Sequence, residues 1–431
     1  MYRPLQKTAR TLLILLILAL AVPFHPAAAE TGETVCADFR YVIEEGKAVI
    51  TGYSGEEADL VIPESLDGIP VASVRSLGVQ PCVERVTVPD SVDLEEGALG
   101  LCYVLTDIRV SDTHPTLTLV GPVLFSRDEK TLLCYPSEYP GENYAVPDGT
   151  EAIGRNAFCD CPFLRQVTLP DSVQRIGAGA FSLCGNLTEL GIPASVTAIG
   201  ETAFAHSGLT RLDLGGLTGL TDIADRLAMG CWQLTSVTLP DSVTRIGDEA
   251  FGLTALTGIT LPPSVAEIGV NPFRCCNALE TVTVTGPEDR FVFRWPFLTD
   301  VAGGRVIACA GTASGAVTFP EASVIGDWCC NECMRITSVT VPSALRSLGQ
   351  GAFYGCTGLV AVRIEDAQAL AIGKSAFDYC SALRELTVLG GVAEIDADAF
   401  AHCEQLTRVI TDCEALRPAF EGTGVTVLSP D

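Results

Sequence analysis

The feature that most constrains this chain is a repeat of 23 residues. The stretch "VTLPDSVQRIGAGAF", residues 167–181, returns as "VTLPDSVTRIGDEAF", residues 237–251, with three of fifteen positions changed. A marker isoleucine or leucine recurs in step with this repeat, usually followed by glycine, at Ile153, Ile176, Ile199, Ile223, Ile246, Ile268, Ile325, Leu348, Ile372 and Ile395. Self-similarity at such a period is typical of stacked repeats, so the chain divides into units rather than into ordinary domains.

Each unit encodes one short strand followed by a buried return of the chain. In "LTSVTLP", residues 234–240, alternation places Val237 and Leu239 on one face of a strand and Thr238 on the other. The marker Ile246 then brings a further apolar side chain inward. One unit cannot bury these groups alone, whereas stacked units can. The repeat therefore predicts a solenoid of about twelve 23-residue units with short parallel strands.

Looser copies of the unit centre on Val74 and Leu94. Two intervals between markers are longer than a single step, at 59 residues from Leu94 to Ile153 and 57 residues from Ile268 to Ile325. Each contains two apolar segments around a polar turn, in "GPVLFSRDEKTLLCYP", residues 121–136, and in "WPFLTDVAGGRVIACAG", residues 295–311. Such a pattern is typical of a strand hairpin. We predict two hairpin excursions from the stack, at about residues 111–146 and 283–318.

The pattern C-x-x-L-x-x-V-x-L-P-x-S-V-x-x-I-G-x-x-A-F, as in residues 231–251, resembles the BspA-like, or treponemal-type, leucine-rich repeat of bacterial surface proteins. Residues 41–74 resemble the usual opening of that family. The resemblance implies a leucine-rich-repeat solenoid in an exported protein. Because several members of the family act as adhesins, it also implies adhesion to, or recognition of, an extracellular protein or glycan, without identifying the ligand.

The first thirty residues, "MYRPLQKTARTLLILLILALAVPFHPAAAE", have the form of a secretory signal peptide. Three basic residues precede an apolar run at residues 12–22, which is too short to span a bilayer. We expect cleavage after Ala29 and a protein that is secreted or held non-covalently at the cell surface, without membrane insertion. The expected order is a signal peptide 1–29, an N-terminal cap with the first strands 30–70, BspA-like leucine-rich repeats 71–417 and a C-terminal cap strand 418–431.

The chain is strongly acidic, with a formal net charge of -26. Such a charge repels nucleic acid, so we expect no nucleic-acid partner. The acidic residues are spread along the sequence, which favours a role in solubility. Attraction to a basic partner or to divalent cations is the alternative.

The eighteen cysteines fall mainly at one position of the unit. Ser207 and Thr254 take that position in two units, so it requires a small, weakly polar side chain. Stacked Cβ atoms would lie about 4.8 Å apart, farther than the roughly 3.8 Å of a disulfide. We predict a ladder of buried free thiols, eight residues after each marker, at Cys82, Cys102, Cys161, Cys184, Cys231, Cys276, Cys333, Cys356, Cys380 and Cys403.

Residues 328–333, "WCCNEC", look like a metal-binding run. Cys329 and Cys330, however, stand where Ala-Phe stands in other units, so we interpret them as core substitutions. A local disulfide and a zinc site are the alternatives, although the two separated cysteine or histidine pairs of a zinc site are missing. We expect no metal and no cofactor.

The densest cluster of aromatic and arginine side chains is "EDRFVFRWPF", residues 288–297. Residues of these types often anchor protein interfaces. The candidate binding patch consists of Arg290, Phe291, Phe293, Arg294 and Trp295. The alternative is that the aromatic side chains cover the core of the hairpin itself.

A second candidate surface is the outward position of the strands, where threonine predominates. Strand propensity alone explains threonine at such a position, but a regular column could also bind an extended glycan, a peptide or ordered water. The candidate concave face consists of Thr168, Asp213, Thr238, Thr260, Thr340, Arg363 and Thr387.

Motifs for catalysis are missing from the sequence. It has no G-x-S-x-G, no H-E-x-x-H and no phosphate-binding loop, and His206 and His402 occupy similar positions that suggest a loop surface. We therefore predict a binding scaffold and no enzyme. A structural protein of the cell envelope without a specific ligand is the first alternative, and an enzyme with a dispersed site on the excursions or the concave face is the second. The sequence leaves the oligomeric state open.

Overall fold

The structure is a computed structural model that describes residues 32–287, 290–341 and 345–430. The predicted signal peptide, residues 1–29, lies outside the described residues. The chain divides into two compact units, Met1–Leu209 and Thr210–Asp431. No helix among the described residues combines the length and the apolar character that a membrane crossing requires.

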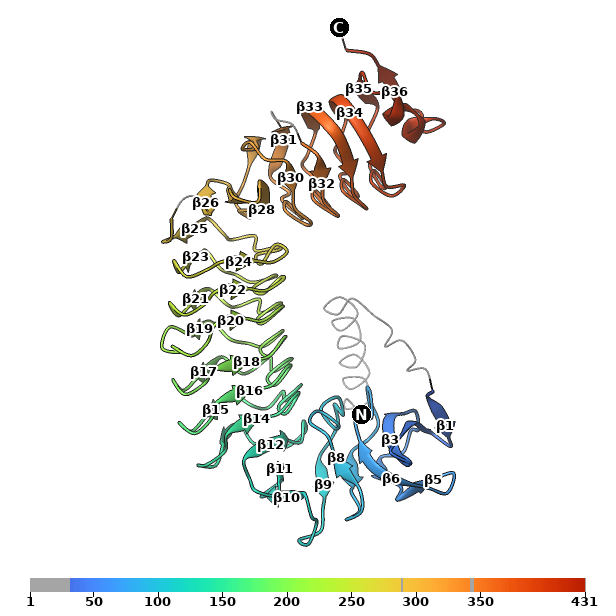
Figure 1. The fold of residues 1–431 in the computed structure, drawn as a ribbon, viewed down its shortest axis with the longest axis vertical. Coiled ribbons are helices and arrows are strands. Elements are labelled where there is room, and N and C mark those ends of the chain that lie inside the picture. The colour runs from blue at the N-terminus through green and yellow to red at the C-terminus, as the bar shows by residue number, and fades with distance from the viewer. Residues whose placement is uncertain (1–31, 288–289, 342–344, 431) are drawn as a thin grey trace, which may run out of the picture. The chain divides into compact units, whose positions relative to one another are not determined.

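Most repeats form one coil with two short strands, and the coils stack as the predicted solenoid requires (Figure 1). In a representative coil, the first strand is β21 (Ser236–Thr238) and the second strand is β22 (Arg245–Ile246). Strand β22 pairs in parallel with β20 (Asp222–Ile223) and with β24 (Glu267–Ile268) of the neighbouring coils. The parallel first strands are confirmed, whereas the second strands were not predicted, because two residues are too few to show alternation.

Unit 1 begins with a mainly antiparallel sheet and continues as coils. The initial sheet contains β1 (Thr34–Cys36), β2 (Phe39–Glu44), β3 (Lys47–Tyr53), β5 (Ser65–Leu66), β6 (Ile69–Val74) and β8 (Asp93–Leu94). The first strands of its coils are β4 (Asp59–Val61), β7 (Arg85–Thr87), β9 (Asp107–Arg109), β13 (Asn143–Ala145), β15 (Gln166–Thr168) and β17 (Glu189–Gly191). Its later second strands are β14 (Ala152–Ile153), β16 (Arg175–Ile176) and β18 (Ala198–Ile199).

Unit 2 repeats the same plan. Its other first strands are β19 (Arg211–Asp213), β23 (Gly258–Leu261), β25 (Thr281–Val284), β29 (Gly315–Thr318), β31 (Ile336–Val341), β35 (Arg408–Thr411) and β36 (Thr426–Leu428). Its other second strands are β30 (Val324–Ile325) and β32 (Ser347–Leu348). Two long strands, β33 (Ala361–Ile372) and β34 (Glu385–Ile395), cover both positions of their coils, and the short 3-10 helix η1 (Glu414–Phe420) follows the last coil.

Both predicted hairpin excursions are present, and each gains one strand that the sequence did not indicate. The first consists of β10 (Leu117–Val120), β11 (Val123–Ser126) and β12 (Thr131–Cys134), and the second of β26 (Phe291–Arg294), β27 (Phe297–Asp300) and β28 (Arg305–Cys309). Successive strands of each excursion are antiparallel. The last strand of each then pairs in parallel with the next second strand, which returns the chain to the stack.

The core of each unit is a set of columns in which equivalent side chains stack. Phe353 and Phe377, from successive coils, have ring centroids 5.3 Å apart and an interplanar angle of 4°. Phe377 stacks in turn on Phe400 at 5.2 Å, and Phe158 stacks on Phe181 at 5.0 Å in unit 1. Such rings contribute to stability through their large buried area.

At several markers the following glycine is required because successive backbones approach closely there. A Cβ on Gly177 would lie 2.6 Å from the backbone nitrogen of Arg155, and a Cβ on Gly349 would lie 2.5 Å from that of Asp327. Any side chain at these positions would therefore force neighbouring coils apart.

The predicted ladder of buried free thiols is confirmed. All eighteen cysteines lie in the described residues and are free. Of the ten ladder residues, only Cys82 and Cys403 are partly exposed. Cys329 and Cys330, from the "WCCNEC" run, are also buried in the core, at 1% and 0% exposure, as core substitutions should be.

Candidate functional site

The tip of the second excursion presents an exposed tryptophan. A two-residue turn of Trp295 and Pro296, joined by a cis peptide bond, connects β26 to β27. The Trp295 side chain is 56% exposed, and its neighbour Arg294 is also exposed. These two residues form the excursion tip, an accessible pair of the residue types that dominate protein interfaces.

The rest of the predicted patch is engaged within the protein. Phe291 is buried at 5% exposure, and Phe293 is half-buried. The exposed Arg290 donates a hydrogen bond to the backbone carbonyl of Ala266, and its guanidinium carbon lies 5.6 Å from the centroid of the Phe291 ring. The Phe291 side chain therefore belongs to the core of the hairpin and not to an accessible surface, as the alternative interpretation of this cluster expected.

Most positions of the predicted concave face are exposed, but some are buried or half-buried. Thr387 is only 3% exposed, so it does not contribute to an accessible face. Its neighbours in register are Arg363 and Ile410, from the two adjoining strands, and their longer side chains flank it. Thr340 is half-buried, and the exposed members are Thr168, Asp213, Thr238, Thr260 and Arg363.

Unit 2 carries a column of aromatic side chains that the sequence did not predict. The guanidinium of Arg274 lies 4.3 Å from the centroid of the Trp328 ring. The distance between ring centroids is 5.8 Å from Trp328 to Tyr354. It is 5.4 Å from Tyr354 to Tyr379 and 4.2 Å from Tyr379 to His402. Tyr379 is 46% exposed, so the column reaches the surface.

Polar contacts hold both ends of this aromatic column. Arg274 forms an ion pair of 2.5 Å with Glu249 and donates a hydrogen bond of 2.9 Å to Asn331. At the other end, His402 Nδ1 lies 2.8 Å from a carboxylate oxygen of Asp378. Tyr354, Tyr379 and His402 lie one or two residues before ladder cysteines, in "FYGC", "FDYC" and "FAHC". Trp328 lies five residues before Cys333, so these side chains share no single position of the repeat that an alignment would reveal.

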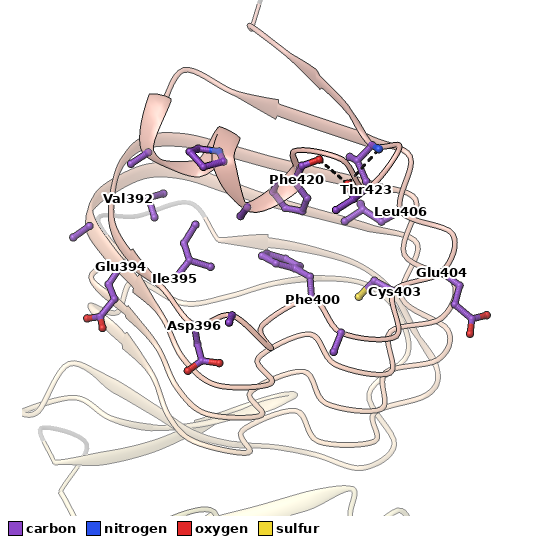
Figure 2. A pocket seen from close by; sticks show the side chains of 17 residues that line it. Val392, Glu394, Ile395, Asp396, Phe400, Cys403, Glu404, Leu406, Phe420 and Thr423 are labelled. Atoms are coloured by element: carbon purple, nitrogen blue, oxygen red, sulfur yellow. Dashed lines mark hydrogen bonds between the residues drawn. The ribbon is translucent and has the colours of Figure 1, made fainter.

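A cavity of about 730 Å³ lies between the last coil and the segment after it, and we call it the C-terminal cavity (Figure 2). One wall is the end of β34, from Val392 to Ile395. Phe400 and Leu406 line it from the last coil, and Phe420 from η1. In Figure 2 the Phe400 and Phe420 rings lie in the space between the coil and η1, while the carboxylates of Glu394, Asp396 and Glu404 point away from it.

The thiol in the wall of the C-terminal cavity is not activated as a nucleophile. Burial raises the pKa of the Cys403 thiol in its wall to about 12, which keeps the thiol protonated and a poor nucleophile at neutral pH. Among the described residues, no group of three or more His, Cys, Asp and Glu side chains is placed to hold a metal ion. The arrangement is suited to binding an apolar group.

The two histidines predicted to lie on a loop surface differ. His402 is exposed. His206 is half-buried, and within the described part of the chain neither ring nitrogen has a hydrogen-bond partner. Burial lowers the pKa of His206 to about 4, so its ring is neutral at physiological pH.

Comparison with known proteins identifies the repeat. A family model described as "BspA type Leucine rich repeat region" matches residues 151–280 and 308–417 in six copies. No curated protein matches the chain.

Two solved structures resemble nearly the whole chain. A leucine rich cell surface protein from Faecalibacterium prausnitzii A2-165 is 25% identical, with a TM-score of 0.57, and the match covers 93% of this chain and 95% of that one. The pneumococcal vaccine antigen PcpA is 15% identical, with a TM-score of 0.50, and the match covers 93% and 99% of the two chains. At that identity, PcpA shows the likeness of fold alone.

Proposed function

The chain belongs to the BspA-type leucine-rich repeat family, and from this premise we propose that it is an exported scaffold that binds an extracellular protein or glycan. The similar protein from Faecalibacterium prausnitzii is described as a cell surface protein, and the first thirty residues have the pattern of a signal peptide. Both observations support a location outside the cell, either secreted or retained at the surface.

The observation that carries this proposal is the exposure of Trp295 at the excursion tip. Trp295 is 56% exposed, so much of a large apolar side chain faces water. Beside it, Arg294 offers a charged group with several hydrogen-bond donors. Both residues lie at the turn of an antiparallel strand pair, which reduces the conformational entropy that is lost when a ligand binds them.

The test is a binding screen of the secreted chain against matrix proteins, mucins and a glycan array. We expect selective and saturable binding that weakens about tenfold or more in a variant with Arg294→Ala and Trp295→Ala, because central Trp and Arg anchors carry most of the energy of an interface. The matched control is Trp232→Ala, which removes a tryptophan that is 64% exposed on another coil.

Other outcomes would support the alternatives. Equal binding by the tip variant and the control would remove the excursion tip from the proposal. Retention of the chain in washed cell walls, with no ligand in the screen, would favour a structural role in the envelope. Turnover of a glycoside or peptide in a substrate library would favour an enzyme.

A further inference from the structure

The C-terminal cavity lies where the stack of second strands stops. In successive coils, a backbone amide of each coil donates a hydrogen bond to the carbonyl of the marker residue before it. These bonds measure 2.8 Å from Gly349 to Ile325, 2.8 Å from Gly373 to Leu348 and 3.0 Å from Asp396 to Ile372. In the described chain no second strand follows Ile395, because the chain continues through β35 into η1. The Val392 amide donates a hydrogen bond of 3.3 Å to the Cys413 sulfur, and beyond it residues Ala393–Ile395 of β34 form an open sheet edge that lines the C-terminal cavity.

Apolar groups that other coils cover are accessible at this edge. The equivalent phenylalanines Phe353 and Phe377 are 1% and 0% exposed, because the next coil stacks on each ring. Phe400 is only half-buried. Its partner beyond the stack is Phe420 of η1, whose ring centroid is 5.2 Å away at a tilt of 54°. The cavity can therefore accept a further large apolar side chain against Phe400.

The surroundings of the C-terminal cavity are acidic. Residues 391–430 contain seven acidic side chains and two arginines. Both arginines pair with carboxylates outside the cavity wall, Arg408 with Glu385 at 3.2 Å and Arg417 with Glu414 at 3.2 Å. The wall itself contributes Glu394, Asp396 and Glu404. A ligand with positive charges beside its apolar group is complementary to this arrangement.

We propose that an extended, basic segment of a partner protein adds as a strand to Ala393–Ile395 and places a large apolar side chain in the C-terminal cavity. The open edge offers the main-chain hydrogen bonds of strand addition, and the cavity beside Phe400 selects the apolar side chain. The carboxylates of Glu394, Asp396 and Glu404 select lysine or arginine at the flanking positions. The proposal rests on the binding role proposed above, but it assigns a second site that does not involve the excursion tip.

The probe is a short fluorescein-labelled peptide that alternates lysine with valine around a central phenylalanine, measured by fluorescence anisotropy with the full secreted chain. We expect saturable binding that weakens about five- to tenfold in the double variant Glu394→Gln with Asp396→Asn, because two partly exposed charge pairs are lost. Raising the ionic strength should weaken binding to the wild-type chain more than to this variant. Ala397→Trp, which fills the cavity, should abolish binding.

Matched controls separate the parts of the proposal. A peptide with N-methylated central amides should lose binding, because it cannot form the strand ladder. A protein control with Asp241→Asn and Glu321→Gln removes two exposed charges far along the sequence from the cavity and should bind normally. The Trp295→Ala variant should also bind the peptide normally. The experiment therefore distinguishes a wrong proposal for the excursion tip from a wrong proposal for this site.

Several results would overturn the proposal. The first is that the peptide does not bind the wild-type chain. The second is that the N-methylated peptide binds as tightly as the unmodified peptide. The third is that the variant with Glu394→Gln and Asp396→Asn binds the peptide as tightly as the wild-type chain. Self-association that Ala397→Trp abolishes would show instead that a second copy of the chain occupies the cavity.

Discussion

The thiol of Cys380 donates a hydrogen bond of 3.0 Å to the backbone carbonyl of Phe353 in the preceding coil. The same contact recurs along the ladder, from Cys184 to Phe158 at 2.9 Å, from Cys276 to Phe251 at 3.1 Å and from Cys403 to Phe377 at 3.1 Å. The ladder position therefore requires a small side chain that can donate a hydrogen bond. Serine and threonine are also small hydrogen-bond donors, and Thr254 at the ladder position donates a bond of 2.8 Å to the carbonyl of Phe251 in its own coil.

The first prediction concerns this hydrogen bond. Replacing Cys380→Ala leaves the carbonyl of Phe353 without its donor and creates a small cavity, so we expect a loss of about 1–3 kcal/mol in the free energy of unfolding. Cys380→Ser keeps a donor and should cost less, at about 1 kcal/mol or below. Urea denaturation of the three proteins measures both changes. Equal losses for alanine and serine would show that only the volume of the side chain matters.

The second prediction is that alkaline pH destabilises the fold through its thiols. Burial raises the pKa of Cys276 from 9.0 to about 11 and that of Cys134 to about 12. The unfolded chain releases these protons from about pH 9 upward, while the folded chain keeps them. The stability that the protonated, buried thiols contribute to the folded chain is therefore complete below pH 9, and it is lost as the pH rises through 11.

Stability against urea between pH 8 and pH 11 measures this effect. The control is Cys276→Thr, which introduces the residue found at the same position in the preceding coil. It should reduce the alkaline loss by about 2 kcal/mol, because one thiol no longer contributes. A loss of the same size in both proteins would assign the alkaline sensitivity to other groups.

The repeat predicted the inward positions of the coil well, because stacking imposes the same requirement on every unit. Val243, Ile246 and Phe251 are each 0% exposed, and the ladder cysteines are free as their parallel stacking demands. The second strand at Arg245–Ile246 was missed, since a strand of two residues has no period that a sequence can display.

The candidate binding residues were harder to predict, because exposure depends on neighbouring coils. Thr387 and Thr238 occupy the same position of the repeat, yet only Thr238 is exposed. The C-terminal cavity arises because a second strand is missing after Ile395, and the repeat pattern does not encode the shape of the segment that follows it. Contacts such as the one between Arg274 and Trp328 join variable positions 54 residues apart in the sequence.

The third prediction concerns His206 and acid. Because burial holds its pKa at about 4, the folded chain keeps this ring neutral while the unfolded chain takes up a proton near pH 6.5. The stability that the neutral His206 ring contributes to the folded chain is present above pH 6.5, and it is lost as the pH falls to 4. His206→Asn should reduce this acid loss by roughly 1–3 kcal/mol, and asparagine tolerates the left-handed backbone at φ 57°. Acid denaturation, followed by circular dichroism, measures this change in acid sensitivity. Parallel denaturation curves for the wild-type protein and the His206→Asn variant would contradict the prediction.

The last prediction is that Arg274 stabilises unit 2 through both its charge and its flat guanidinium. Glu249 has a side chain that is only 13% exposed and pairs with Arg274 at 2.5 Å and with Arg226 at 3.3 Å. Arg274→Ala leaves this carboxylate with a single partner and uncovers the Trp328 ring, so we expect a loss of about 2–3 kcal/mol.

A lysine at this position separates the two contributions. Arg274→Lys keeps the positive charge but loses the planar contact with Trp328 and the Nε hydrogen bond to Asn331, so the expected loss is smaller, at about 1 kcal/mol. A double-mutant cycle of Arg274→Lys with Trp328→Leu should give a coupling free energy of about 0.5–1 kcal/mol in urea denaturation. A coupling of zero would mean that the guanidinium acts through Glu249 and Asn331 alone, and that the aromatic column begins at Trp328 rather than at Arg274.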